Sequence, residues 1–295
     1  MAAVPRPRRS ALYIPGSNAR ALDKGRSIAA DVLILDLEDA VSVEAKDMAR
    51  AAVAAAVGVH AYGKREVVVR VNGLETPWIA RDIAAIVAAH PDAVLVPKIS
   101  RPEDIRRARA AMHAAQAPEG VALWAMIETP LAVLNVAAIA ATAASNSGVP
   151  LAALVIGTND LMTETGMRPS NGREALAPAL AQCVLAARAY GISVLDGTFN
   201  ELNNWDGFRA ECQQGRNFGM DGKTLIHPRQ VQIANEVYAP TGEEVEWAEK
   251  VLAAFQRPEN ATRAVIQVDG RMVERLHERL ALRVLETATA ILPDD

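Results

Sequence analysis

This chain has few aromatic residues and few cysteines, and it has no excess of basic charge. A barrel glycosidase would use paired carboxylates, but Phe, Trp and Tyr make up only 4% of the 295 residues, too few to favour sugar-stacking surfaces. The formal net charge of −4 does not predict a nucleic-acid-binding protein. Two cysteines occur, Cys183 and Cys212, and they favour a reduced, cytoplasmic protein over a disulfide-bonded one.

Long apolar runs and familiar catalytic signatures are missing as well. The longest stretch without charge, 129–155, contains two asparagines, two prolines and a glycine, so it predicts a strand end, a helix and another strand rather than a membrane span. Residues 1–16 have no long apolar core, and we expect no secretory signal. The chain has no HExxH, no CxxC pair and no GxSxG, and the DGKT at 221–224 lacks the upstream glycine of a P-loop.

A repeated unit dominates the chain up to residue 238: a short apolar run, a polar cluster, then an alanine-rich helical stretch. Several runs are continuously apolar, as expected for parallel strands covered on both faces. Eight such units predict a (β/α)₈ TIM barrel over 1–238, with a doubly wound sheet as the alternative. The runs expected to form strands are 11–15, 32–37, 66–71, 93–97, 121–127, 153–157, 193–195 and 223–226.

Helix-start signals fit this pattern. Ser100–Glu103 has the form of a capping box with a proline in the first turn, and Thr129 precedes a proline at the first helical position. Past residue 238 the rhythm changes. A capping box at Thr241–Glu244, an Asp-Gly hairpin within 263–273 and a final amphipathic helix predict a C-terminal extension over 239–295.

Almost every expected strand ends in an ionisable residue. In a barrel the carboxyl ends of the strands converge on one face, which is where barrel enzymes carry their active sites. A purely structural barrel does not need this charge. The residues, in chain order, are Asp36, Glu38, Asp39, Arg70, Lys98, Glu128, Asp160, Asp196 and His227.

Each of these residues has a plainer interpretation when taken alone. Asp160 could cap a helix, Glu128 could favour a helix dipole, and the acidic cluster at 36–39 could be a solvated turn. Taken together, several carboxylates in one mouth must be neutralised by a cation, a proton or a basic side chain. Carboxylate oxygens without His or Cys suit Mg²⁺. Arg70, at the end of a buried strand, requires an anion, either a protein carboxylate or a substrate carboxylate held bidentately.

With these residues in view, the chain resembles the citrate lyase β-subunit-like group, the malyl-CoA and citramalyl-CoA lyase type, of the HpcH/HpaI aldolase superfamily. The resemblance covers nearly the whole chain. It rests on ordered motifs: RRSALYIPGSNARAL, ADVLILDLEDAV, VVVRVNG, VLVPKI, MIETPLAV, IGTNDL and GMDGKTLIHPRQV. The family implies a (β/α)₈ barrel and a homotrimer or hexamer.

The activity that the resemblance implies is a Mg²⁺-dependent carbon–carbon lyase. It would cleave a 3-hydroxyacyl-CoA thioester to acetyl-CoA and a 2-oxo acid, glyoxylate or pyruvate. Two alternatives stay open: the citryl-cleaving β subunit of a citrate lyase complex, and a catalytically silent barrel that binds a CoA thioester or a 2-oxo acid. Nothing in the residues calls for a nucleic acid or a membrane as partner.

The same resemblance implies roles for single residues. Glu128 and Asp160 would ligate Mg²⁺, Arg70 would hold the 2-oxo acid carboxylate, and Glu38 and Asp39 would orient metal-bound waters and that arginine.

Two further residues receive roles on the same basis. Arg9 would lie near the thioester and its CoA. Glu274 stands where many relatives have an Asp that is contributed to the neighbouring subunit as a general acid or base. Because the Glu side chain is one methylene longer, the backbone would have to withdraw, which leaves this assignment, and activity itself, open.

Overall fold

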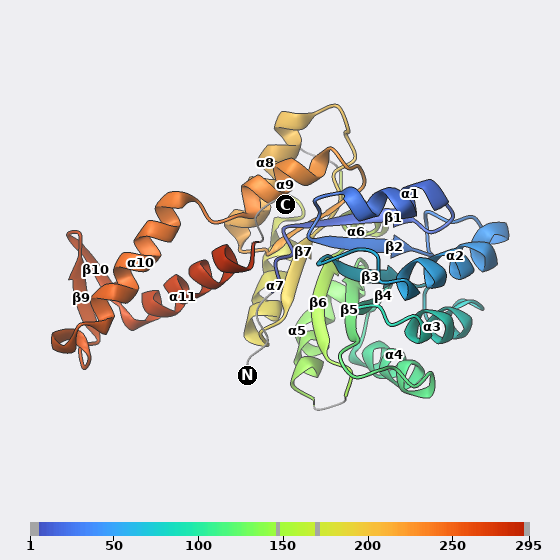
Figure 1. Ribbon diagram of the computed structural model, residues 1–295, viewed down its shortest axis with the longest axis horizontal. Helices are drawn as coiled ribbons and strands as arrows, with labels where there is room; N and C mark the ends of the chain where they lie inside the picture. The colour runs from blue at the N-terminus through green and yellow to red at the C-terminus, as the bar shows by residue number, and fades with distance from the viewer. Residues whose placement is uncertain (1–5, 146–147, 169–171, 292–295) are drawn as a thin grey trace. The chain divides into compact units, whose positions relative to one another are not determined.

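The computed structural model describes residues 6–145, 148–168 and 172–291 (Figure 1). These residues form two compact units, one of which is Arg8–Val237, while the chain from Tyr238 onward belongs to the other.

The larger unit is a closed barrel of eight parallel strands, with helices around it (Figure 1). Each strand pairs with the next along the chain, and β8 closes the ring by pairing with β1. The predicted (β/α)₈ barrel is therefore confirmed, and the doubly wound alternative is wrong. The strands are β1 (Ser10–Pro15), β2 (Val32–Asp36), β3 (Glu66–Arg70), β4 (Ala93–Val96), β5 (Ala122–Ile127), β6 (Leu151–Ile156), β7 (Ser193–Asp196) and β8 (Gly222–Leu225).

Helices connect these strands. They are α1 (Ala19–Lys24), α2 (Lys46–Gly58), α3 (Ile79–Ala88), α4 (Pro102–Ala114), α5 (Pro130–Ala141), α6 (Thr158–Thr165), α7 (Ala177–Ala189), α8 (Trp205–Phe218) and α9 (Gln230–Tyr238). Short 3-10 turns are η1 (Gly25–Ser27), η2 (Val43–Ala45) and η3 (Thr142–Ala144).

Two of the predicted helix starts can be compared with the structure. The Thr129 side chain accepts a hydrogen bond from the Ala132 N–H, as an N-cap should. The predicted box at Ser100–Glu103 is wrong by one residue. Because Pro102 occupies the first helical position, the Asp104 carboxylate is the one that accepts from the backbone N–H groups of Ser100 and Arg101.

The alternation of side chains along each strand decides which residues point into the barrel. Ile34, Val68 and Met126 belong to the apolar cluster inside it. The residues two positions further on are Asp36, Arg70 and Glu128, so the carboxyl end of the interior carries charge. Because these three side chains point into the barrel, the candidate site lies at the carboxyl end of its interior.

The amino end of the interior is closed by an arginine. Arg8 Nε and Nη2 donate to the two carboxylate oxygens of Glu66, both at 2.7 Å. Its Nη1 donates to Ser193 Oγ at 2.8 Å, and its guanidinium lies 4.9 Å from the centre of the Trp124 ring. The guanidinium thus donates to both a carboxylate and a hydroxyl. These side chains fill the amino end of the barrel interior.

The smaller unit contains α10 (Gly242–Gln256), η4 (Pro258–Asn260), β9 (Val265–Val268), β10 (Arg271–Glu274) and α11 (Arg275–Ala290). The predicted hairpin is present: β9 and β10 are antiparallel, and Asp269 and Gly270 at the turn both have positive φ. Thr241 and Glu244 form the predicted capping box of α10. Among the described residues, no helix combines the length and apolar character that crossing a bilayer requires.

Candidate active site

The loop after β2 is built around Asp36, which is completely buried. Both of its carboxylate oxygens accept from Arg70, with Nε–Oδ1 and Nη2–Oδ2 distances of 2.7 Å. The same oxygens accept from the backbone N–H groups of Glu38 and Ala40. A buried carboxylate needs such partners, because leaving it unpaired would be very costly. Asp36 therefore anchors the arginine and shapes the acidic loop.

Arg70 has one face left for other partners. Its Nη1 lies 2.8 Å from Glu38 Oε2 and 3.6 Å from Asp39 Oδ2. The Tyr13 ring lies beside the guanidinium, with its centre at 4.8 Å. The Nε–Nη2 fork is taken by Asp36, so a second carboxylate has to meet this arginine at Nη1 and the remaining N–H of Nη2. A bidentate grip on a substrate carboxylate through that fork is not available in this arrangement.

Glu38 lies at the mouth with an unsatisfied oxygen. Burial raises its pKa to about 7, and the Arg70 guanidinium opposes this shift. Its Oε2 is buried and, although close to Arg70, accepts no hydrogen bond from any of the described residues. Asp39 beside it is mostly exposed. A carboxyl with a pKa raised toward neutrality is suited to proton transfer near neutral pH.

Lys46 stabilises the acidic loop after β2 through hydrogen bonds to its backbone. The sequence did not lead us to predict this role. Its Nζ donates to the carbonyl oxygens of Leu37 and Glu38, at 2.8 and 2.7 Å, and lies 5.4 Å from the centre of the Trp78 ring. Lys46 is the first residue of α2, where the helix dipole disfavours a cation. A lysine at that position soon after an acidic cluster was the signal that could have identified it.

Glu128 and Asp160 lie close together at the carboxyl end. Glu128 follows β5 and is almost fully buried, and Asp160 lies in the first turn of α6. Burial raises the pKa of Glu128 to about 8, which the Lys98 ammonium counteracts. Burial also disfavours charged Asp160, but hydrogen bonds from Lys98 and from the Glu128 carboxyl outweigh it and lower the pKa of Asp160.

Gly157 makes room for the Glu128 carboxyl. A Cβ added at this glycine would lie 2.4 Å from Glu128 Cβ and 2.7 Å from its Oε2. Since real side chains do not approach so closely, any residue other than glycine would force Glu128 to move. The space beside Gly157 at the start of α6, here called the cradle, is therefore what accommodates the Glu128 carboxyl.

The donor set fits a hard divalent cation. Glu128, just after β5, and Asp160, in the first turn of α6, offer carboxylate oxygens. The described residues contain no group of three or more His, Cys, Asp and Glu side chains suited to a metal. A site with two protein carboxylates and the remaining positions left for water and substrate is typical of Mg²⁺ rather than of Zn²⁺.

Other predicted residues lie elsewhere. Arg9, at the amino end of β1, forms a bidentate pair with Asp31, so the structure does not bring it to the carboxyl-end mouth. Asp196 points outward, in contrast to its expected place in the mouth, because the preceding Leu195 faces the interior. Its partners are Lys223 and Arg173, at 3.0 and 2.8 Å.

Glu274 belongs to the smaller unit. It is the N-cap of α11, and its backbone N–H donates to His277 Nδ1. Its predicted role in a neighbouring subunit's site stays a prediction.

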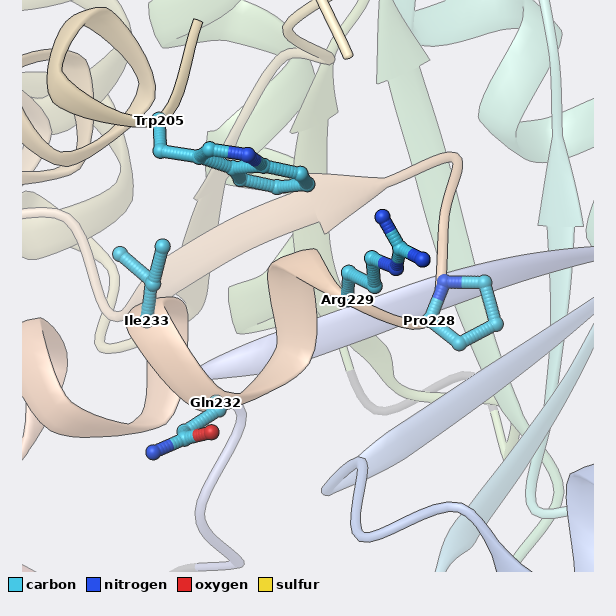
Figure 2. A pocket seen from close by; sticks show the side chains of 5 residues that line it. All are labelled: Trp205, Pro228, Arg229, Gln232 and Ile233. Carbon is cyan, nitrogen blue, oxygen red and sulfur yellow. The ribbon is translucent and has the colours of Figure 1, made fainter. Parts of the chain in front are cut away.

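A shallow pocket of about 340 Å³ lies beside the carboxyl end of β8. It is lined by Trp205, Pro228, Arg229, Gln232 and Ile233. Figure 2 shows Ile233, on α9, pointing toward the Trp205 indole, and Arg229 in the turn just before that helix. His227, expected at the mouth, accepts a hydrogen bond at Nδ1 from the Arg229 N–H in the same loop. An indole face and a guanidinium can together hold an anionic ligand with a flat ring.

The chain is similar to known proteins over nearly its whole length. The chain is 45% identical over 285 residues to a (3S)-malyl-CoA thioesterase of Cereibacter sphaeroides, covering 97% of this chain and 96% of the relative. It is 37% identical to the citrate lyase subunit beta of Leuconostoc mesenteroides, covering 96% and 94%. These relatives are enzymes.

A solved structure of CitE from Mycobacterium tuberculosis, in complex with magnesium, acetoacetate and coenzyme A, is similar with a TM-score of 0.73 and 27% identity, covering 95% of this chain and 97% of that one. The HpcH/HpaI aldolase/citrate lyase family model matches residues 9–228. With most of the barrel matched, the chain belongs to the HpcH/HpaI aldolase/citrate lyase family.

Proposed function

We propose that this protein is a Mg²⁺-dependent carbon–carbon lyase for a 3-hydroxy-carboxyacyl-CoA of the malyl-CoA or citramalyl-CoA type. The products would be acetyl-CoA and a 2-oxo acid, glyoxylate or pyruvate. The observation that carries the proposal is the pair Glu128 and Asp160 beside Arg70, at the carboxyl end of the barrel. The solved relative with magnesium and coenzyme A supports both the metal and the thioester.

Glu128 and Asp160 would hold the Mg²⁺. When bound, the ion would act as a Lewis acid on the oxygen atoms of the substrate's reacting end. Arg70, fixed by Asp36, would receive the substrate carboxylate at Nη1. Its rigid anchoring means that little of the arginine's freedom is lost when the substrate binds.

Glu38 is our candidate for the base that removes the 3-hydroxyl proton. Its pKa of about 7 and its unsatisfied Oε2 suit proton transfer near neutral pH. Loss of that proton lets the C–C bond open to the 2-oxo acid and a thioester enolate. Protonation of the enolate then gives acetyl-CoA. We propose Glu274 of a neighbouring copy as the acid, which requires a homotrimer or hexamer.

Hydrolysis of the thioester is the second candidate function. The relative that is 45% identical over nearly the whole chain is named for thioester hydrolysis. Arg70 and Glu38 would then direct water to the thioester carbonyl, beside the ion that Glu128 and Asp160 would hold, and free CoA and a hydroxy acid would be released.

A product assay separates these functions. Purified protein with malyl-CoA or citramalyl-CoA and Mg²⁺ should release a 2-oxo acid and acetyl-CoA, and EDTA should abolish this release. Free CoA and malate without glyoxylate would contradict the lyase and establish the thioesterase. No product from either thioester would contradict both and leave a binding barrel.

A further inference from the structure

Lys98 lies between the two carboxyls that we assign to the metal. Its Nζ is 2.6 Å from Asp160 Oδ2 and 3.9 Å from Glu128 Oε1. Its backbone N–H donates to the same Glu128 Oε1 at 2.7 Å. Neither the resemblance nor the proposed mechanism gives this lysine a task.

The backbone at Lys98 is held in an unusual conformation. Its φ is +56°, a left-handed value that costs free energy for a residue other than glycine. The loop is fixed by its neighbours: Ser100 Oγ is hydrogen-bonded to Thr129 Oγ1, and Asn135 Nδ2 donates to the Ser100 carbonyl. The strain therefore points the Lys98 backbone N–H at Glu128 while its side chain reaches over to Asp160.

The ammonium and a divalent cation would lie beside the same two carboxyls. A Mg²⁺ ion held by Asp160 and Glu128 would lie about 2.1 Å from each ligand oxygen. An ammonium kept at its present position would then be a like charge only a few ångström away, and such repulsion is strong near a protein surface. We therefore expect this repulsion to move the ammonium away when the ion binds.

We propose that Lys98 is a resident counter-cation: without the metal its ammonium pairs with Asp160 beside the Glu128 carboxyl, and metal binding displaces it. This inference rests on the proposed function, since it takes the two carboxylates as metal ligands. The side chain is 42% exposed, so solvent is open to the displaced ammonium. The N–H contact to Glu128 is made by the backbone, so it does not depend on the side chain.

The test is metal affinity measured by calorimetry with Mg²⁺ and by Mn²⁺ paramagnetic resonance, with no substrate present. Lys98→Met should bind the ion about tenfold more tightly than the wild type, because no ion pair has to be broken and no repulsion remains. Its metal-free form should have a lower Tm, and its metal-bound form should not. Lys98→Arg keeps the charge and should bind no more tightly than the wild type. Lys64→Met removes an exposed lysine outside the site and is the matched control.

The possible results separate this inference from the proposed function. If the wild type binds Mg²⁺ and Glu128→Gln does not, while Lys98→Met binds no more tightly than the wild type, the counter-cation role is overturned and the metal site stands. If neither the wild type nor Lys98→Met binds Mg²⁺ or Mn²⁺, the proposed metal site fails and this inference fails with it.

Discussion

The two ends of the barrel contain the same chemical unit in different surroundings. At the amino end, Arg8 grips Glu66 with two hydrogen bonds, and a serine hydroxyl takes its remaining nitrogen. At the carboxyl end, Arg70 grips Asp36 in the same way, but its remaining nitrogen faces Glu38, whose buried oxygen accepts no hydrogen bond from the described residues. One pair is completed by a neutral hydroxyl, and the other by the ionisable Glu38 carboxyl at the mouth.

The difference shows how one fold separates stability from chemistry. A buried arginine–carboxylate pair by itself says nothing about function, since a structural plug contains it too. Function is indicated by what surrounds the second pair: two carboxyls with raised pKa values, about 7 for Glu38 and about 8 for Glu128, and a lysine that bridges Glu128 to Asp160.

The largest expected effect comes from removing one carboxylate at each end. Glu128→Gln should abolish Mg²⁺ binding and lower kcat about a thousandfold, because a charged ligand is lost from the metal. Glu66→Gln should instead destabilise folding by about 3 kcal/mol, because it weakens the pairing of a buried arginine, and should leave kcat near the wild-type value. Steady-state kinetics and urea unfolding of both variants check this. If folded Glu66→Gln protein had a reduced kcat, the amino end of the barrel would not be purely structural, and the contrast between the two ends would be wrong.

Arg70→Ala should affect both properties. It should cost about 2–4 kcal/mol of transition-state stabilisation by removing a charged hydrogen bond to substrate, and it should also lower the Tm, because it leaves Asp36 buried without its partner. Kinetics on the folded fraction separate the two effects. A loss of kcat/KM below tenfold would mean that the arginine serves the fold alone.

Gly157→Ala should weaken Mg²⁺ binding about 10- to 100-fold, because the added methyl displaces the Glu128 carboxyl. Gly58→Ala is the control: it lies at the end of α2, and an added Cβ would meet nothing within 4 Å. Calorimetric titration of both variants gives the answer. Unchanged affinity in Gly157→Ala would show that Glu128 does not depend on this cradle.

The smallest expected effect is on the pH dependence of stability. Burial raises the pKa of Glu38 to about 7 and that of Glu128 to about 8, from the ordinary 4.5. The metal-free folded state therefore holds protons that the unfolded chain has released. Their contribution to stability is full below pH 4.5 and is lost as the pH rises to about 8. Urea unfolding across this range should show the decline, and Glu128→Gln should flatten it. An equal slope in both proteins would contradict the assignment.

Much of this comparison could be predicted from the sequence. The barrel followed from eight apolar runs, and the carboxyl-end location of Arg70, Glu128 and Asp160 followed from the end of the strand at which each stands. The predictions that were wrong depended on the direction in which a side chain points. Asp196 stands at a strand end but is one residue out of phase with the interior, so it faces α8.

The sequence also could not predict which side chains pair with one another in the site. Arg70 could have turned its fork to a substrate or to the protein, and only the spatial pairing of β2 with β3 shows that Asp36 takes it. The role of Gly157 depends on its contact with Glu128, a residue of another loop, which no local pattern encodes. Arg9 was assigned by resemblance, and the register of β1 places it at the opposite end of the barrel.

The most direct test of the metal site is anomalous diffraction from crystals soaked in Mn²⁺. We expect a single strong peak about 2.1 Å from one oxygen of Glu128 and one oxygen of Asp160, with the Lys98 ammonium moved away from both. A peak at any other place in the barrel, or none between these carboxylates at saturating Mn²⁺, would contradict the account.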